Sequence, residues 1–168
     1  MKQTLVVLLV LAALGVLLRS GGFLPGMGRD PAMIANPVYA AVRFRTAIHD
    51  RTFEMVELAK TFDQDDCNRI AANIIERMQR HHGDGLAWEL ESFHCTTGLD
   101  ARSERLFENK PTFVNYVSAT PGSSSERDLR MIIWGVTAEE GDVICSVIPR
   151  VQERWNGAVS CIHALPGQ

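Results

Sequence analysis

Residues 64–81, Gln-Asp-Asp-Cys-Asn-Arg-Ile-Ala-Ala-Asn-Ile-Ile-Glu-Arg-Met-Gln-Arg-His, form the most regular pattern in the chain. Their apolar side chains recur three and four residues apart, at Cys67, Ile70, Ala71, Ile74, Ile75 and Met78. This spacing predicts one buried face of an α-helix. Acidic residues at its start and basic residues at its end suit the helix dipole. Cys67 is therefore expected to point into the core of a folded domain.

Three segments that follow this helix have the composition of β-strands. Residues 86–95 begin by alternating apolar and acidic side chains, which predicts a strand with Trp88 facing inward. Residues 112–119 and 129–136 are apolar at odd and even positions alike, as in strands covered on both faces. The Gly- and Ser-rich residues 120–128 between them predict a hairpin loop.

A further helix is expected near the C-terminus. Thr137 and Glu140 have the spacing of a capping box, and helical spacing of apolar residues continues to Trp155. Pro149 lies inside this pattern and predicts a kink, because proline removes a backbone hydrogen bond and clashes with the preceding turn. The alternative is a strand over residues 143–148 before a shorter helix.

The segment 37–62 is the most ambiguous part of the chain. Its main apolar residues suit a helix and are Val38, Val42, Ile48, Met55, Ala59 and Phe62. Asn36 followed by Pro37 is typical of a helix start. We therefore predict a helix here, interrupted near residues 49–51. A strand over residues 42–48 is the alternative, since apolar or β-branched residues alternate there.

The order of these elements indicates an α+β fold. We expect two helices packed on a mostly antiparallel sheet of about four strands, the last of them at residues 158–163. A helical turn capped by Asp100 is expected in residues 96–111. Residues 37–168 are predicted to form a single globular domain, and the sequence contains no internal repeat.

The N-terminus predicts a membrane segment. Residues 4–18 carry no charge and are almost entirely apolar, and they are followed by a Gly/Pro-rich stretch, residues 19–36. We interpret residues 1–18 as a transmembrane signal anchor and residues 19–36 as a tether. A cleaved signal peptide is the alternative, although Leu18 to Gly22 make a poor cleavage site. A third interpretation is a buried N-terminal helix.

All four cysteines lie in the predicted domain, and none belongs to a CxxC motif. An even number of cysteines behind an export signal favours disulfides in an oxidising compartment. Sequence alone leaves three pairings open. We predict Cys67–Cys95 and Cys145–Cys161, because each pair closes a short loop, worth roughly 3 kcal/mol in the chain-entropy model.

The sequence cluster that most suggests ligand chemistry is His81, His82 and Asp84, with His94 at the end of the next predicted strand. Imidazole and carboxylate groups suit zinc or copper. Adjacent histidines leave a helix in different directions, however, so solvation of a helix end is the favoured interpretation and no metal or cofactor is assigned. His94 and Cys95 point to opposite faces of a strand, which argues against a catalytic pair.

Other polar groups have structural explanations that we favour over chemical ones. Glu89 and Glu91 share one face of a strand, as on a solvated sheet surface. The acidic residues 63–66 suit capping of the following helix, because the glycine and glutamate of a calcium loop are missing. Trp134 is expected in the core; were it exposed, it would create a face for binding a partner.

These observations exclude some functions and favour others. The formal charge of −3 and the absence of a basic stripe argue against a nucleic-acid partner. We predict a non-catalytic accessory or binding protein, tethered to the inner membrane by its N-terminal helix, with its domain in the periplasm and a protein partner in the cell envelope. The alternatives are a periplasmic hydrolytic or metal-dependent enzyme that uses the histidine cluster, and a secreted effector or inhibitor.

Overall fold

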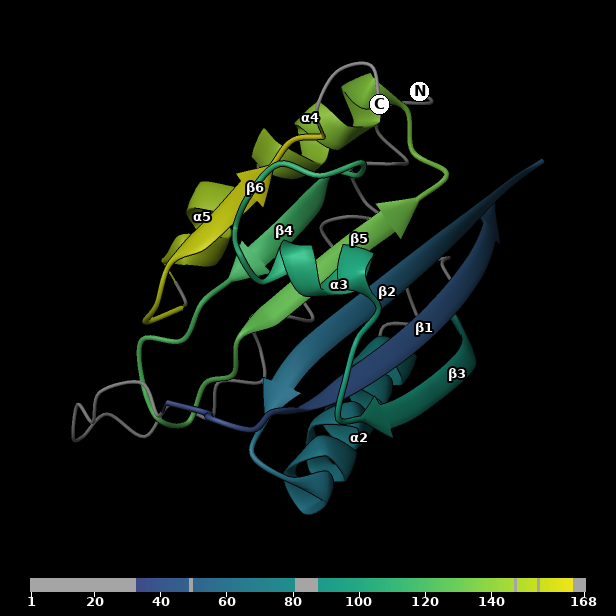
Figure 1. Ribbon diagram of the computed structural model, residues 1–168. Helices are drawn as coiled ribbons and strands as arrows, with labels where there is room; N and C mark the ends of the chain where they lie inside the picture. The colour runs from purple at the N-terminus through teal and green to yellow at the C-terminus, as the bar shows by residue number, and fades with distance from the viewer. Residues whose placement is uncertain (1–32, 49, 81–87, 147, 154, 165–168) are drawn as a thin grey trace.

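The computed structural model describes residues 33–48, 50–80, 88–146, 148–153 and 155–164. These residues form one six-stranded sheet with the order β3-β1-β2-β5-β4-β6, and every pairing is antiparallel (Figure 1). The strands are β1 (Val38–Ile48), β2 (Arg51–Thr61), β3 (Glu89–Thr96), β4 (Tyr116–Ala119), β5 (Leu129–Trp134) and β6 (Val159–Ile162). The helices are α2 (Gln64–Arg80), α3 (Ala101–Leu106), α4 (Ala138–Ser146) and α5 (Ile148–Gln152). The α+β class and the antiparallel sheet are as expected.

The expected anchor, residues 1–18, and most of the tether lie outside the described residues. Within the described part of the chain, no helix is long and apolar enough to cross a membrane.

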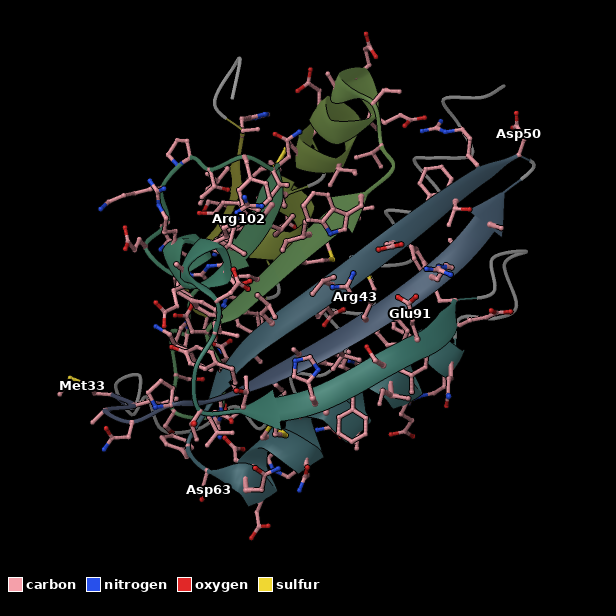
Figure 2. All side chains as sticks on the ribbon, turned by 45° about the vertical axis from the view of Figure 1, so that its right-hand side comes forward. Met33, Arg43, Asp50, Asp63, Glu91 and Arg102 are labelled. Atoms are coloured by element: carbon pink, nitrogen blue, oxygen red, sulfur yellow. A yellow bond between two sulfur atoms is a disulfide. The ribbon has the colours of Figure 1, made fainter. Side chains whose placement is uncertain are left out.

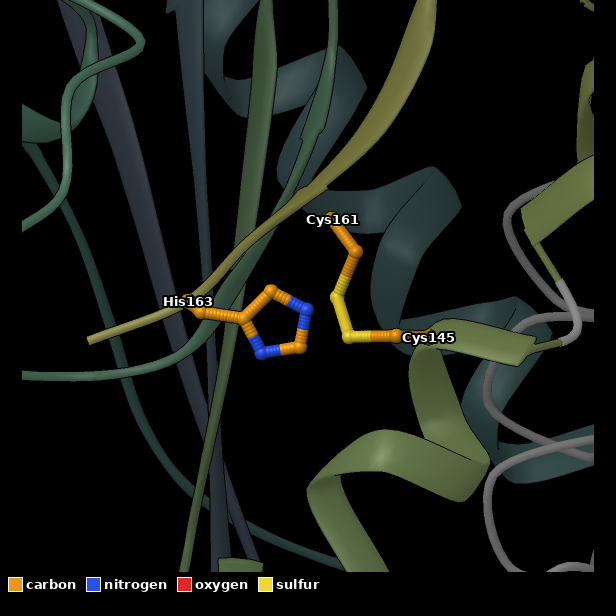
Figure 3. Close-up of side chains that lie close together, drawn as sticks. All are labelled: Cys145, Cys161 and His163. Carbon is orange, nitrogen blue, oxygen red and sulfur yellow. A yellow bond between two sulfur atoms is a disulfide. The ribbon is translucent and has the colours of Figure 1, made fainter.

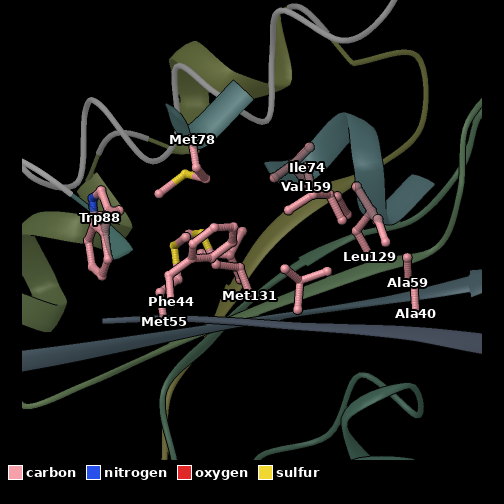
Figure 4. Close-up of a cluster of buried hydrophobic side chains, with 14 of the residues drawn as sticks. Ala40, Phe44, Met55, Ala59, Ile74, Met78, Trp88, Leu129, Met131 and Val159 are labelled. Carbon is pink, nitrogen blue, oxygen red and sulfur yellow. The ribbon is translucent and has the colours of Figure 1, made fainter. Parts of the chain in front are cut away.

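The helices divide unequally between the two faces of the sheet. Side chains of α2, α4 and α5 pack with alternate residues of the strands in the main core. Figure 4 shows Ile74 and Met78 of α2 on one side of the sheet, above Phe44 and Met131. Among the described residues, α3 and the segments directly before and after it cover the opposite side, where Leu106 packs against Val56 and Ile132. We call this opposite side the open face.

The prediction of a helix over residues 37–62 is wrong, and the strand alternative is closer to the structure. This segment is the long hairpin of β1 and β2, which pair from Val38–Thr61 to Ile48–Arg51. Val38 and Val42, and likewise Met55 and Ala59, are four residues apart, and a separation of four fits both a helical and an alternating pattern. The two strands missed here account for the difference between the expected four strands and the observed six.

The connection order repeats within the sheet, although no repeat is visible in the sequence. The hairpin β1–β2 is followed by α2 and then by β3, which pairs with β1. The hairpin β4–β5 is likewise followed by α4 and α5 and then by β6, which pairs with β4. The two halves meet where β2 pairs with β5. Each half is thus a ββαβ unit that contributes three strands.

Other local expectations are confirmed. The carboxylate of Asp100 accepts hydrogen bonds from the backbone N–H groups of Arg102 and Ser103 at the start of α3. The Thr137 and Glu140 side chains form the reciprocal bonds of a capping box, with distances of 3.3 and 2.8 Å. The kinked helix is divided into α4 and α5, with Pro149 in the first turn of α5, where proline is tolerated.

Each ββαβ unit contains one disulfide that joins its helix to its last strand. Cys67 of α2 is bonded to Cys95 of β3, with a Cα–Cα distance of 6.1 Å. Cys145 of α4 is bonded to Cys161 of β6, with a Cα–Cα distance of 5.4 Å. These are the two pairs that the loop lengths favoured. Cys67 is fully buried in the main core, as the helical pattern indicated.

The main core also contains a charged pair beneath α2. Glu57 of β2 is fully enclosed, and its carboxylate lies 3.7 Å from the guanidinium of Arg77. Burial raises the pKa of Glu57 above its ordinary value, and the charge of Arg77 only partly opposes this. Burial also lowers the pKa of Arg77. The protonated form of Glu57 is therefore favoured by folding.

We expect this carboxyl group to make the stability of the domain fall as the pH rises. A carboxyl group whose pKa is raised by folding stabilises the domain fully when the pH is below its pKa in the unfolded chain. This stabilisation is lost as the pH rises through the pKa of the folded protein, and the free energy of unfolding falls by at most about 1.4 kcal/mol per pH unit. The E57Q variant should lack this slope and should be the more stable protein at pH 8. Urea unfolding between pH 4 and 8 measures both curves; equal slopes would contradict the assignment to Glu57.

Candidate functional site

The structure tests little of the expected histidine cluster. His81, His82 and Asp84 lie outside the described residues. His94 is exposed on β3, opposite Ala41 in the register, and thus on the open face. Cys95 lies opposite Ala40 and faces α2, so His94 and Cys95 do point to opposite sides of the sheet.

The open face contains a ladder of alternating charges that crosses three strands. Arg43 and Arg45 of β1 lie between Glu91 of β3 and Glu54 of β2. The closest N–O distances are 2.7 Å from Arg45 to Glu91 and 3.1 Å from Arg43 to Glu54. Figure 2 shows Arg43 and Glu91 on the side of the sheet turned toward the viewer. Glu91 is therefore an ion-pair partner of both arginines.

Two aromatic side chains border this ladder. Trp134 of β5 lies opposite Glu54 in the register, and its ring stacks on Phe113 at a centroid distance of 6.0 Å. The guanidinium of Arg102 on α3 lies over the Phe113 ring, 5.4 Å from its centroid. Phe113 is 41% exposed, and Trp134 is half-buried. The expectation that Trp134 belongs to the core is correct only in part, because α3 covers the open face incompletely.

We define the open-face patch as the following seven residues: Arg43, Arg45, Glu54, Glu91, Arg102, Phe113 and Trp134.

A buried arginine holds the aromatic side of this patch in place. The Nε atom of Arg130 on β5 donates a 2.8 Å hydrogen bond to the carbonyl of Leu106, the last residue of α3. The Arg130 side chain is fully enclosed and also pairs with Asp128 at 2.6 Å. The Tyr116 hydroxyl donates to the carbonyl of Lys110 and fixes the segment that leads to Phe113. The patch is therefore part of a preorganised surface.

A second group of chemically active side chains lies at the opposite edge of the sheet. The Cys145–Cys161 disulfide is half-buried, and a nitrogen of the exposed His163 lies within 4.8 Å of both sulfur atoms (Figure 3). The Nδ1 atom of His163 is 3.8 Å from a carboxylate oxygen of Asp142. We call these four residues the cysteine–histidine cluster. Three of them, Cys145, Cys161 and His163, are the one group of three or more such ligand side chains that comes together in the described residues.

The regular spacing of side chains along α4 and β6 places these four residues on facing sides of the two elements. Asp142 and Cys145 are three residues apart on α4 and so share one face of the helix. Cys161 and His163 are two residues apart at the end of β6 and so point to the same side. A cavity of about 20 Å³, the size of one water molecule, adjoins the disulfide between α4 and the sheet and is lined mainly by apolar side chains.

Sequence reasoning missed this cluster because it considered only histidines near one another in the chain. The signal that could have found it is the combination of an Asp-x-x-Cys spacing in a predicted helix with a Cys-x-His spacing in a predicted strand. His94 is not part of the cluster. It lies on β3, five strands away from β6, which corresponds to about 24 Å.

Comparison with known proteins gives no match: no family model, no curated protein and no solved structure is significantly similar to this chain.

Proposed function

We propose that this chain is a non-catalytic binding protein of the cell envelope, tethered to the inner membrane, that presents the open-face patch to a protein partner in the periplasm. The observation that carries the proposal is the stacked pair of exposed Phe113 and half-buried Trp134, beside three arginines on the face that α2, α4 and α5 leave uncovered. Tryptophan and arginine are the residue types that most often dominate the energy of protein interfaces.

The chemistry of the patch suggests the chemistry of the partner. Four of its charges already form ion pairs with one another, so they would define the rim of an interface and add little affinity. Arg102 is exposed, and no carboxylate in the described part of the chain pairs with it. The partner segment that fits best has an apolar side chain to cover the aromatic pair and a carboxylate to meet Arg102.

The proposed location rests on two features of the chain. Residues 4–18 are apolar enough to serve as an anchor, and the Gly/Pro-rich residues after them suit a tether. Both disulfides lie in the domain, which favours an oxidising compartment such as the periplasm.

Photo-crosslinking in bacterial cells tests this proposal. A photoreactive phenylalanine analogue at Phe113 of the full-length protein is expected to crosslink one discrete protein, with the product in the membrane fraction. The same analogue at the exposed Gln79 of α2, on the other side of the sheet, is the matched control. The Trp134→Ala variant should weaken binding of the purified partner by about 30-fold, as expected for an interface hot spot of 2 kcal/mol.

Two results would overturn the proposal. One is equal crosslinking from Phe113 and Gln79. The other is a purified partner whose affinity is the same for the wild-type protein and for the W134A and R102E variants, provided that circular dichroism shows that both variants are folded.

A further inference from the structure

The geometry of the cysteine–histidine cluster points to a redox-controlled metal site. We propose that reduction of the Cys145–Cys161 disulfide creates a zinc site in which both thiolates and the His163 imidazole are ligands, with Asp142 or a water molecule as the fourth. Oxidation closes the disulfide and releases the ion. This site is separate from the open-face patch and does not depend on the function proposed for that patch.

The backbone already holds the donors at suitable separations. A tetrahedral zinc ion with Zn–S bonds of about 2.3 Å needs its two sulfur atoms about 3.8 Å apart. The Cα atoms of Cys145 and Cys161 are 5.4 Å apart, so a change in side-chain rotamers suffices to open the sulfur atoms to this distance. The donor atoms of Cys145, Cys161 and His163 all lie within 4.8 Å of one another.

Asp142 is a candidate for the fourth zinc ligand. The carboxylate of Asp142 is next to the His163 imidazole, and their side chains are 74% and 57% exposed. An ion can therefore reach the cluster from solvent. Two thiolates, an imidazole and a carboxylate or water form a donor set that favours zinc over magnesium or calcium, which prefer oxygen ligands.

The other disulfide lacks these features. Cys67 is fully buried, and its partner Cys95 lies beside Asn68. The nearest acidic side chain in sequence, Asp66, accepts hydrogen bonds from Arg127. Within the described residues, no histidine joins Cys67 and Cys95 in a group of metal ligands. The two disulfides therefore differ in chemistry although they occupy corresponding places in the two ββαβ units.

The reaction is a thiol–disulfide exchange followed by ligand exchange. A dithiol reductant gives two electrons and two protons to the Cys145–Cys161 bond, which becomes two thiols while the reductant becomes a disulfide. Zinc binding then releases the two thiol protons to solvent, because thiolates are the ligands. A disulfide oxidant reverses the process: it accepts two electrons, the Cys145–Cys161 bond forms again, and the zinc ion leaves.

Cobalt and zinc titrations of the full-length protein test this proposal. The protein is reduced with dithiothreitol, desalted without oxygen and titrated with Co²⁺. One equivalent should bind with the thiolate-to-cobalt absorption and visible bands of a tetrahedral site, and Zn²⁺ should displace it. The oxidised protein should show neither signal. The H163A variant should still form the disulfide but should bind zinc at least 10-fold more weakly.

Matched variants separate this site from the rest of the chain. The double variant C145S/C161S should lose the cobalt spectrum, whereas C67S/C95S should keep it. A reduced, folded protein that binds no cobalt would overturn the proposal, as would a spectrum that survives in C145S/C161S. If reduction unfolds the domain, zinc should restore its circular dichroism spectrum, and failure to do so also overturns the proposal.

Discussion

The R127A variant is expected to lose about 3 kcal/mol of its free energy of unfolding at pH 7, because the substitution leaves a buried carboxylate without its main partner. Arg127 donates two hydrogen bonds to Asp66, at 2.8 and 3.1 Å, and both side chains are less than 10% exposed. The guanidinium also lies 4.5 Å from the centroid of the Phe62 ring. Arg127 thus ties the start of α2 in the first ββαβ unit to the hairpin loop of the second.

The pH dependence of this loss has a definite sign. Burial alone would raise the pKa of Asp66, but the hydrogen bonds from Arg127 and from the backbone N–H of Phe62, with the charges of Arg127 and Arg69, lower it below its ordinary value. A carboxyl group whose pKa is lowered by folding stabilises the protein when the pH is above its pKa in the unfolded chain. This stabilisation is lost as the pH falls through the pKa of the folded protein. The difference between R127A and the wild-type protein should therefore shrink in acid.

Urea unfolding at pH 7 and at pH 3 measures this effect. The control is R80A, which removes an ion pair with Glu76 on the same helix whose partners are both 65% exposed. Such a pair contributes at most about 1 kcal/mol, so R80A should remain close to the wild-type protein at both pH values. A loss in R127A no larger than that in R80A would show that the Asp66–Arg127 pair does not stabilise the fold.

Sequence patterns predicted the elements whose local signals agree with their final environment. The helix over residues 64–81 has a single apolar face, and α2 buries that face. The strands at residues 112–119 and 129–136 are apolar on both faces, and β4 and β5 are buried on both for most of their length. Their observed bounds are shorter, because strand ends depend on pairing partners as well as composition.

The hairpin of β1 and β2 could not be predicted in the same way. Each strand is 11 residues long, and its polar residues are placed by tertiary contacts. Glu57 faces the core because Arg77 of α2 lies above it, whereas Arg43 and Arg45 face the open side because Glu54 and Glu91 flank them. A prediction that places every charged residue on the solvent-facing side of a strand is therefore wrong for β2.

The two candidate sites could not be predicted from the sequence either, because both depend on contacts between distant parts of the chain. Trp134 belongs to a strand with apolar residues on both of its faces, so the placement of α3 is needed to show which face is left open. His163 meets Asp142 and Cys145 only because β6 lies against α4, through a pairing with β4 that joins distant parts of the chain. The disulfide pairing, by contrast, is the one that loop length favoured among the three possible pairings.

The C67A/C95A variant, without the first disulfide, is the second change for which we expect a large effect. The bond spans 28 residues, for which the chain-entropy model gives a stabilisation of about 3.5 kcal/mol. It also joins the edge strand β3 to α2. Six of the eight residues of β3 are exposed, so this strand is held mainly by its pairing with β1 and by the disulfide.

Two measurements distinguish this role from a general loss of packing. Urea unfolding should give a free energy lower by at least about 3 kcal/mol and a steeper denaturant dependence, because the unfolded chain without the cross-link exposes more surface. Hydrogen exchange should accelerate first in the backbone amides of β3, whereas those of β2 and β5 should keep the protection of the central strands. The shorter loop of Cys145–Cys161, 16 residues, predicts a smaller loss for C145A/C161A. Unchanged exchange in β3, with a loss below 1 kcal/mol, would mean that the pairing with β1 alone holds the edge of the sheet.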